Sequence, residues 1–276
     1  MYNQFHLAFK YFSYYFSSSN SKGHGMHSPF VFEFITKVLN DKAKYPDYIQ
    51  VENLRKVLLK DQTVLSIEDF GAGSTVDKTN LRTIASIAKN AAKPAKYGQL
   101  LHRMVRYYQP QTILELGTSL GITTSYLSLA KPDAKLITME GATVMAEAAR
   151  QNFKTLKLSN VFVKEGNFDH TLSTVIQTMG GPDSHRVEGL LPIDFAFIDG
   201  NHRREPTEKY FNQILPATHN NSILIFDDIH WSNEMEQAWE TIKRHPSVRC
   251  TIDLFFIGIV LFQQEFREKQ NFVVRF

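Results

Sequence analysis

The chain has 276 residues, of which 43% are hydrophobic and 21% are charged, a composition typical of a globular protein large enough to bury a core. The net charge is only +3, and no run of Lys and Arg is long enough to form a nucleic-acid-binding arm. The single Cys, Cys250, excludes an internal disulfide framework and a zinc site with paired thiols, and it is consistent with the cytoplasmic location that we expect.

The N-terminal part is expected to be helical. Four phenylalanines recur at helical spacing between residues 5 and 16, which predicts an amphipathic helix packed against the rest of the protein. The segment lacks the cleavage site of a signal peptide, and no segment is apolar for long enough to span a membrane. Ser28 as N-cap and Pro29 in the first turn predict a second helix start.

Two polar segments interrupt this region. Residues 17–27 form a connector that contains His24 and His27, and residues 69–77 form a loop of small residues. Either segment could reach over a site, but two histidines in a glycine-containing connector are more often solvated or structural.

From residue 96 onward, strands and helices alternate. The strands are expected at residues 112–116, 135–140, 161–166, 194–199 and 222–228. This order predicts an α/β fold with a doubly wound, mostly parallel, Rossmann-like sheet of seven strands, which binds ligands at the carboxyl ends of its strands. The β-rich stretch at 251–276 predicts an antiparallel edge strand, and Asn233 with Glu236 predicts a capping box before it. We therefore divide the chain into an N-terminal helical extension or cap, residues 1–94, and a main domain, residues 95–276.

A glycine loop follows the first strand of this sheet and opens a helix. Gly117 and Gly121 let the backbone turn sharply and approach a ligand, and the first N–H groups of the next helix suit a carboxylate or a phosphate. A nicotinamide dinucleotide fingerprint has glycine where Ser119 stands, and Glu115 would lie in the path of a pyrophosphate. Both features disfavour a nicotinamide-dependent oxidoreductase, whereas Glu115 suits a ligand with an ammonium group.

Polar residues also stand at the next two strand ends. Glu140 ends the second strand, where an acid can accept hydrogen bonds from both hydroxyls of a ribose. Asn167 and Phe168 follow the third strand and could meet the edge and the face of an adenine. The glycines alone would indicate only a structural turn, but together with Glu140 they predict a nucleoside site.

The stretch "YGQLLHRMVRYYQPQTILELGTSLGITTSYL", followed by "KLITME", resembles class I S-adenosylmethionine-dependent methyltransferases, and specifically their catechol O-methyltransferase-like branch. The resemblance runs from about residue 96 to about residue 263, and the first ninety-odd residues have no counterpart. It implies that Glu140, with Gly141 beside it, holds the ribose of S-adenosylmethionine. It also implies a methionine site made of Glu115, Gly117, Thr118, Ser119 and Gly121.

The same branch holds a divalent cation between an Asp after the fourth strand and an Asp-Asn pair after the fifth. By resemblance these positions are Asp199, which would also lie beside the donor, and the pair Asp227 and Asp228. Carboxylates that converge repel one another unless a cation lies between them, and oxygen ligands suit Mg²⁺ or Mn²⁺. The general base of the branch is a Lys; here that position is His202, whose imidazole suits proton transfer near neutral pH.

Two departures from the branch leave its mechanism open here, because Asp228 replaces its Asn and His202 replaces its Lys. The simpler interpretations are that Asp199 forms a turn before Gly200 and that Asp227 and Asp228 are solvated acids at a loop entrance. We also expect His230 to be an exposed loop residue.

The leading hypothesis is a methyltransferase that O-methylates a small hydroxylated acceptor, with S-adenosylmethionine as donor and with a divalent metal as a candidate cofactor. The alternatives are an RNA or protein methyltransferase, which the modest charge does not favour, and a non-catalytic scaffold protein that keeps the nucleoside site. The sequence identifies neither the acceptor nor the oligomeric state.

Overall fold

The computed structural model describes residues 2–18, 28–67, 80–90, 93–179 and 192–276. The predictions for His24, His27 and residues 69–77 lie outside these residues. Contacts divide the chain into two compact units: residues 41–171, which we call the central unit, and residues 1–40 with 172–276, which we call the terminal unit. The boundary that the sequence suggests between residues 94 and 95 stays a prediction.

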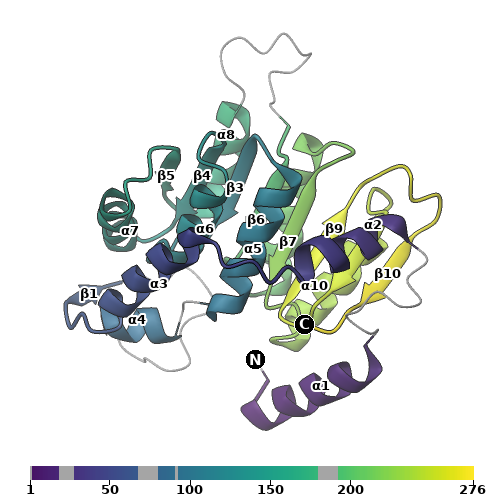
Figure 1. The fold of residues 1–276 in the computed structure, drawn as a ribbon, viewed down its shortest axis with the longest axis horizontal. Helices are drawn as coiled ribbons and strands as arrows, with labels where there is room; N and C mark the ends of the chain where they lie inside the picture. The colour runs from purple at the N-terminus through teal and green to yellow at the C-terminus, as the bar shows by residue number, and fades with distance from the viewer. Residues whose placement is uncertain (1, 19–27, 68–79, 91–92, 180–191) are drawn as a thin grey trace. The chain divides into compact units, whose positions relative to one another are not determined.

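The central unit alternates helices with strands, as the sequence predicts (Figure 1). Its elements are α3 (Pro46–Leu58), β1 (Val64–Ser66), β2 (Leu81–Thr83), α4 (Ile84–Asn90), α5 (Ala95–Tyr108), β3 (Thr112–Leu116), α6 (Ile122–Ala130), β4 (Lys135–Glu140), α7 (Thr143–Thr155) and β5 (Val161–Glu165). Strand β4 pairs in parallel with β3 on one side and with β5 on the other. The antiparallel pair β1 and β2 is an addition that the sequence pattern did not predict.

Helix α3 belongs to this unit although it precedes residue 94. The hydroxyl of Tyr126 on α6 donates a hydrogen bond to Glu52 Oε1 on α3 at 2.7 Å. His102 Nε2, on α5, lies 2.8 Å from Asp47 Oδ2 at the start of α3. One buried cluster of the unit includes Tyr126, Val51 and Leu54, so that part of the expected extension packs against α6.

The terminal unit contains the last strands of the fold. Its elements are α1 (Gln4–Ser17), α2 (Pro29–Glu33), the π-helical turn η1 (Phe34–Leu39), most of α8 (Phe168–Met179), β6 (Phe195–Ile198), α9 (Arg204–Ile214), η2 (Leu215–Ala217), β7 (Ile223–Asp227), α10 (Asn233–Arg244), β8 (Cys250–Asp253), β9 (Ile257–Leu261) and β10 (Gln270–Val273). Strand β6 pairs in parallel with β7, and β9 is antiparallel to both β7 and β8. The predicted antiparallel strand is present, but it lies between β7 and β8. Strand β10 pairs in parallel with β8. With it, the described residues contain eight strands of the mostly parallel sheet, one more than expected.

The N-caps of α2 and α10 can be compared with the capping predictions. Ser28 caps α2 as predicted, because its side chain accepts a hydrogen bond from the N–H of Val31 and Pro29 takes the first helical position. Helix α10 is capped by Ser232, which accepts from the N–H of Met235 at 3.2 Å, so the predicted capping box at Asn233 was wrong by one residue. Ser232 rather than Asn233 is the N-cap because the extended backbone of Ser232 places its hydroxyl over the first turn of α10.

Helix α1 is present as predicted, but the packing expected for its phenylalanines was wrong. The phenylalanine side chains are 62–90% exposed. The helix is instead anchored by Tyr14, which is 7% exposed and whose hydroxyl donates to the carbonyl oxygen of Val274. Among the described residues, no helix is both long enough and apolar enough to cross a membrane.

An acid–base cluster joins α1 to α10 and β8. His230 is not an exposed loop residue: its Nδ1 lies 2.9 Å from Glu236 Oε1 and its Nε2 lies 2.7 Å from Asp253 Oδ2. Glu236 also accepts hydrogen bonds from Lys10 Nζ and from the hydroxyl of Tyr2. Because carboxylates flank both ring nitrogens, the protonated ring can donate to both sides.

The cluster predicts how stability depends on pH. Burial alone would lower the pKa of His230, but the hydrogen bonds and charges of Asp253 and Glu236 outweigh burial and raise the pKa above its usual value of 6.5. Burial would raise the pKa of Glu236, but hydrogen bonds from Lys10, His230 and Tyr2 hold the pKa below its usual value of 4.5. The histidine therefore contributes stability that is complete below about pH 6.5 and lost as pH rises through its folded-state pKa. The glutamate contributes stability that is present above about pH 4.5 and lost as pH falls.

We expect His230→Gln to remove the part of this dependence that lies on the alkaline side. Urea unfolding of wild type and variant from pH 5 to pH 9 measures it, because the difference between the two proteins cancels the contributions of other histidines. The difference in unfolding free energy should be largest near pH 5–6 and should shrink as pH rises. A difference that grows with pH would show that His230 is held neutral in the folded protein.

Candidate functional site

The loop after β3 has a fixed backbone. The N–H groups of Gly117 and Thr118 donate to the carbonyl oxygen of Met139 at 3.0 and 3.1 Å, and the N–H of Gly121 donates to the carbonyl oxygen of Thr118 at 2.8 Å. Gly117 and Gly121 have φ angles of 100° and 75°, in the left-handed region that favours glycine. The predicted sharp turn is therefore present, and it is bonded to the end of β4.

Helix α6 starts directly from this loop. Gly121 occupies its N-cap position, and no side chain caps the helix there. The first N–H groups of a helix lack partners within the helix, and the dipole adds positive potential at the same end. The loop and the start of α6 together suit a bound carboxylate, as the sequence predicts.

Glu140 is held in place by the same loop. Its Oε2 accepts a hydrogen bond from the N–H of Ser119 at 2.8 Å, and its Oε1 accepts one from the N–H of Ala142 at 3.1 Å. Glu140, which is half-buried, is therefore fixed in orientation at the end of β4. Its predicted contact with ribose hydroxyls stays a prediction. Gly141 is the residue between Glu140 and Ala142, whose N–H donates to the Glu140 carboxylate.

Glu115 lies beneath the loop and is fully buried. Its Oε2 accepts hydrogen bonds from the hydroxyls of Thr124, at 2.5 Å, and Thr138, at 2.6 Å. Since the single proton of Thr138 points to Glu115, Thr118 must be the donor in its 2.6 Å contact with Thr138. Glu115 thus links β4 and α6 by hydrogen bonds, and it is linked to the loop through Thr138 and Thr118. Its contact with a ligand ammonium group stays a prediction.

At the end of β5, the structure gives Asn167 a local role. Its Oδ1 accepts the N–H of Asp169 at 2.9 Å, which caps the first turn of α8, where Phe168 is the first residue. The N–H of Gly166 donates to the carbonyl oxygen of Glu140 at 2.9 Å, so this strand end is joined to the ribose-binding candidate. The adenine contacts of Asn167 and Phe168 stay predictions.

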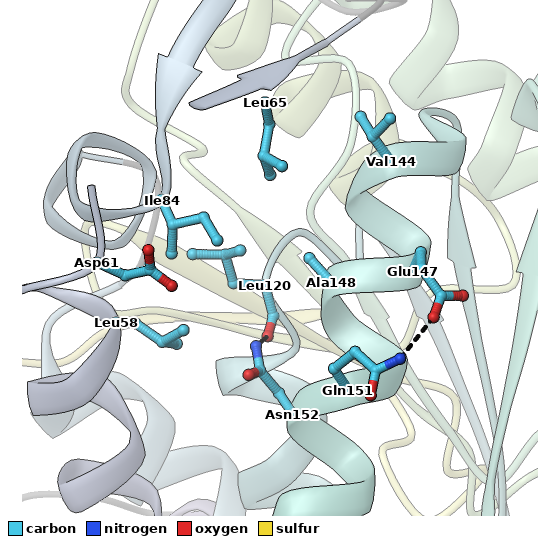
Figure 2. Close-up of a pocket in the computed structure, with 10 residues that line it drawn as sticks. All are labelled: Leu58, Asp61, Leu65, Ile84, Leu120, Val144, Glu147, Ala148, Gln151 and Asn152. Atoms are coloured by element: carbon cyan, nitrogen blue, oxygen red, sulfur yellow. Dashed lines mark hydrogen bonds between the residues drawn. The ribbon is translucent and has the colours of Figure 1, made fainter. Parts of the chain in front are cut away.

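A cavity of about 420 Å³ lies in the central unit, on the side of α7 that faces α3, β1 and α4 (Figure 2). Val144, Ala148 and Asn152 line it from α7, and Leu120 of the glycine loop points into it. Asn152 Nδ2 donates a hydrogen bond to the carbonyl oxygen of Leu120 at 2.9 Å. This hydrogen bond, which the sequence did not indicate, fixes the backbone of Leu120 in the glycine loop.

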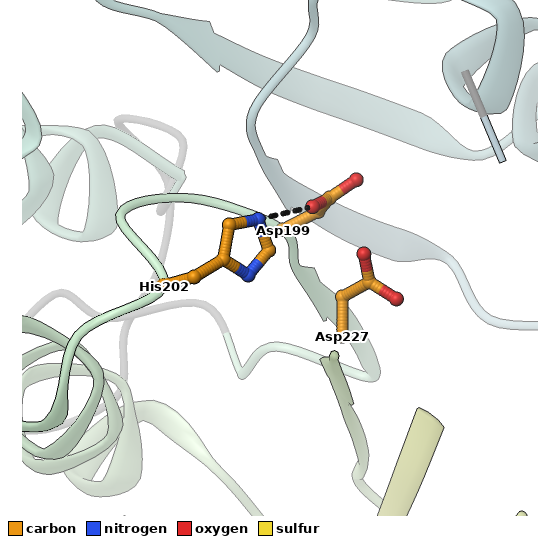
Figure 3. Close-up of side chains that lie close together, drawn as sticks. All are labelled: Asp199, His202 and Asp227. Atoms are coloured by element: carbon orange, nitrogen blue, oxygen red, sulfur yellow. Dashed lines mark ion pairs between the residues drawn. The ribbon is translucent and has the colours of Figure 1, made fainter. Parts of the chain in front are cut away.

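The terminal unit brings together the second group of predicted residues. Asp199 follows β6, His202 follows the next turn, and Asp227 ends β7; each offers a ligand atom, and these atoms all lie within 4.8 Å of one another (Figure 3). His202 Nε2 lies 3.3 Å from Asp199 Oδ1. Asp227 is 1% exposed, so its carboxyl group has little water around it. The simpler interpretation of Asp227 as a solvated acid is wrong.

Asp228 lies beside this group, and its role as a metal ligand stays a prediction. It has a left-handed backbone, with φ 52°, and its Oδ2 lies 3.9 Å from His202 Nδ1. In the described part of the chain, His202 rather than Asp228 completes the three-residue group with Asp199 and Asp227. Two carboxylates and one imidazole fit a divalent cation, and the imidazole nitrogen favours Mn²⁺ over Mg²⁺.

The sequence of this chain is similar to those of methyltransferases. Residues 114–229 match a family described as a methyltransferase domain. Over 134 residues, or 48% of this chain, the sequence is 28% identical to a catechol O-methyltransferase of Niastella koreensis, and the match spans 55% of that protein. The chain thus covers about half of the length of this curated relative. The resemblance to the catechol O-methyltransferase-like branch is confirmed.

Solved structures establish the fold. An O-methyltransferase of Streptomyces achromogenes, involved in tomaymycin synthesis and bound to S-adenosylmethionine, superposes with a TM-score of 0.52 and 21% identity, covering 63% of this chain and 82% of its own. A methyltransferase of Podospora anserina, bound to S-adenosylhomocysteine, gives a TM-score of 0.56 at 14% identity, with 95% of this chain and 98% of its own covered. The predicted α/β, mostly parallel Rossmann-like fold is confirmed.

Proposed function

We propose that this chain is an S-adenosylmethionine-dependent methyltransferase that methylates a hydroxyl oxygen of a small acceptor with the help of a divalent cation. The observation that carries the proposal is the carboxylate of Glu140, which two backbone N–H groups fix at the end of β4 beside the glycine loop. The match of residues 114–229 to a methyltransferase domain supports it. A net charge of only +3 gives no support to a nucleic acid as acceptor.

In this proposal the central unit holds the donor. S-adenosylmethionine, when bound, supplies an electrophilic methyl group. Glu140 accepts the ribose hydroxyls, and the first N–H groups of α6 bind the methionine carboxylate. Glu115 adds negative charge beneath the loop, which favours the ammonium group and the sulfonium. Since these groups are fixed by Ser119, Ala142 and the threonine hydroxyls, the site is organised before the donor arrives.

Asp199, His202 and Asp227 act on the acceptor. The two carboxylates would hold the divalent cation, which supplies Lewis acidity to an acceptor hydroxyl, and His202 beside them would accept the proton. We assign the ring proton of neutral His202 to Nε2, because this nitrogen lies 3.3 Å from Asp199 Oδ1. The basic nitrogen is then Nδ1, and the carboxylate of Asp228 at 3.9 Å favours the charged ring that forms when Nδ1 takes a proton.

His202 cannot bind a cation and accept a proton through the same nitrogen, so its two roles make different predictions. If it is the general base, His202→Gln lowers kcat by about a hundredfold or more and removes the acidic limb of the pH–rate profile, while Mn²⁺ affinity changes little. If it is a metal ligand, Mn²⁺ affinity falls by about ten- to a hundredfold. Calorimetric titration with Mn²⁺ and a pH profile of kcat, both on the same variant, separate the roles. We expect the first outcome.

The proposal is tested by methyl transfer from isotopically labelled S-adenosylmethionine to a panel of catechols, other phenols and aliphatic alcohols, with Mn²⁺, with Mg²⁺ or with EDTA. We expect labelled product from at least one hydroxylated acceptor, with turnover suppressed by EDTA and restored by the metal. Transfer to the matching amine or thiol but to no hydroxyl compound would contradict the choice of oxygen. Undiminished transfer in EDTA would contradict the role of the cation.

A further inference from the structure

Helix α1 carries two aromatic faces that point in opposite directions. Residues on an α-helix are about 100° apart, so positions 7, 10, 11, 14 and 18 fall on one side, and these are the partly or fully buried residues of the segment. The opposite side is a stripe about 60° wide. We call it the phenylalanine stripe; it consists of Phe5, Phe9, Phe12 and Phe16.

The inner face is firmly attached to the terminal unit. Tyr11 packs edge-on against Phe255, with ring centroids 5.1 Å apart, and Tyr14 is buried beside the same ring. Lys10 Nζ bonds both oxygens of Glu236, at 2.7 and 2.8 Å. The helix is therefore held in one orientation by its inner face, and the outward direction of the stripe is a property of the folded terminal unit.

The stripe itself is left in contact with water. Its four side chains are 90%, 74%, 62% and 77% exposed, in chain order. Since an aromatic side chain offers about 150–250 Å², the stripe exposes roughly 450–750 Å² of apolar surface. The largest apolar patch of a typical monomer is about 300–600 Å². A patch at or above this limit, on a helix fixed by its other face, indicates a surface that a partner covers.

The spacing and the charge of the helix identify the partner. The phenylalanines follow one another after four, three and four residues, which is the a/d spacing of a helix that packs against another helix. A helix that lies on a membrane needs a wider apolar face with Lys and Arg along its flanks. Lys10 is the only Lys or Arg of α1, and Glu236 already binds it. A narrow, uncharged stripe therefore fits a second apolar helix better than a lipid surface.

From these observations we infer that the phenylalanine stripe is the interface of a symmetric dimer, in which α1 of one copy packs against α1 of a second copy of this chain. A twofold axis places the same patch on both sides, so a stripe without charges is complementary to itself. Pairing would bury roughly 900–1,500 Å² in total, which reaches the range of specific interfaces, at about 1,200–2,000 Å².

Sedimentation velocity over a range of concentrations tests the inference with the full-length protein. Wild type should sediment at twice the monomer mass at micromolar concentration. The double variant Phe9→Asp, Phe12→Asp should sediment as a monomer, with a dimer dissociation constant raised by about a hundredfold or more. Phe32→Asp on α2, which changes a phenylalanine that is 46% exposed and outside the stripe, should leave the dimer intact. Far-UV circular dichroism of both variants verifies the fold.

A second measurement uses the single cysteine of the chain. Cys250 is fully buried, so an introduced thiol is the accessible one. Phe12→Cys should form a covalent dimer on mild oxidation, whereas Glu240→Cys, on the exposed part of α10, should not. A wild type that stays monomeric at 100 µM would overturn the inference. So would a monomer that floats with phosphatidylcholine vesicles and loses this property in the double variant, because a lipid surface would then be the partner.

Discussion

Replacing Asp227 by Asn is expected to lower kcat/KM for methyl transfer by about a thousandfold, while S-adenosylhomocysteine binds with an affinity within about threefold of wild type. The side chain is 1% exposed at the end of β7, and one of its carboxylate oxygens lies within 4.8 Å of ligand atoms of Asp199 and His202. Asn keeps its size but removes the charge. The charge of Asp227 favours both the binding of a cation and the protonated form of His202. The proposed donor contacts lie in the central unit, so donor binding should not depend on it.

The sign of the stability change separates this role from a structural one. In metal-free buffer, Asp227→Asn removes a buried charge near another carboxylate, so its melting temperature should equal or exceed that of wild type. Glu240→Gln, an exposed carboxylate on α10, is the matched control and should change neither activity nor stability. An Asp227→Asn variant that unfolds more readily and retains its specific activity would identify a structural carboxylate and contradict the account.

Gly121→Ala should destabilise the protein by about 3 kcal/mol or more and weaken S-adenosylhomocysteine binding at least tenfold. A Cβ atom at Gly121 would lie 2.3 Å from Phe153 Cε1, and the φ angle of 75° is one that L side chains rarely adopt. The backbone must shift to relieve both strains. Because Gly121 closes the loop by its hydrogen bond to Thr118, the shift displaces the start of α6.

Urea unfolding and calorimetry measure the two effects of Gly121→Ala. A second change, Phe153→Leu, removes the ring atoms that meet the new Cβ, so the double variant should recover part of the stability lost through the contact but none lost through the backbone angle. Wild-type stability in Gly121→Ala alone would show that the loop adapts freely and that the donor site is not preformed.

The parallel part of the fold was predictable because its signals are local. The strand Thr112–Leu116 is a short apolar run with both faces buried, and the helix after it starts at a glycine. The predicted bounds of β3 and β4 agree with the structure. The pair β1 and β2 was not predictable in this way, since strands of three residues carry too little periodicity.

The candidate site was predictable to the level of residue types but not of partners. Glu140 stands out in the sequence as an acid at a strand end, yet its hydrogen bond to the N–H of Ser119 depends on the left-handed backbone at Ser119, with φ 49°. The exposure of the α1 phenylalanines was not predictable either. Their periodicity shows that they share one face, but the burial of Tyr14 on the opposite face is decided by the packing of α1 on the terminal unit.

The central claim is that Glu140 and the glycine loop hold S-adenosylmethionine, and isothermal titration with S-adenosylhomocysteine tests it most directly. We expect wild type to bind in the micromolar range. Glu140→Ala should bind at least about a hundredfold more weakly, because it loses both ribose contacts and the anchor of Ser119. Glu147→Ala, an exposed carboxylate on α7, should bind like wild type. Absence of binding to wild type, with or without Mn²⁺, would contradict the account, and equal binding by Glu140→Ala would contradict the assigned site.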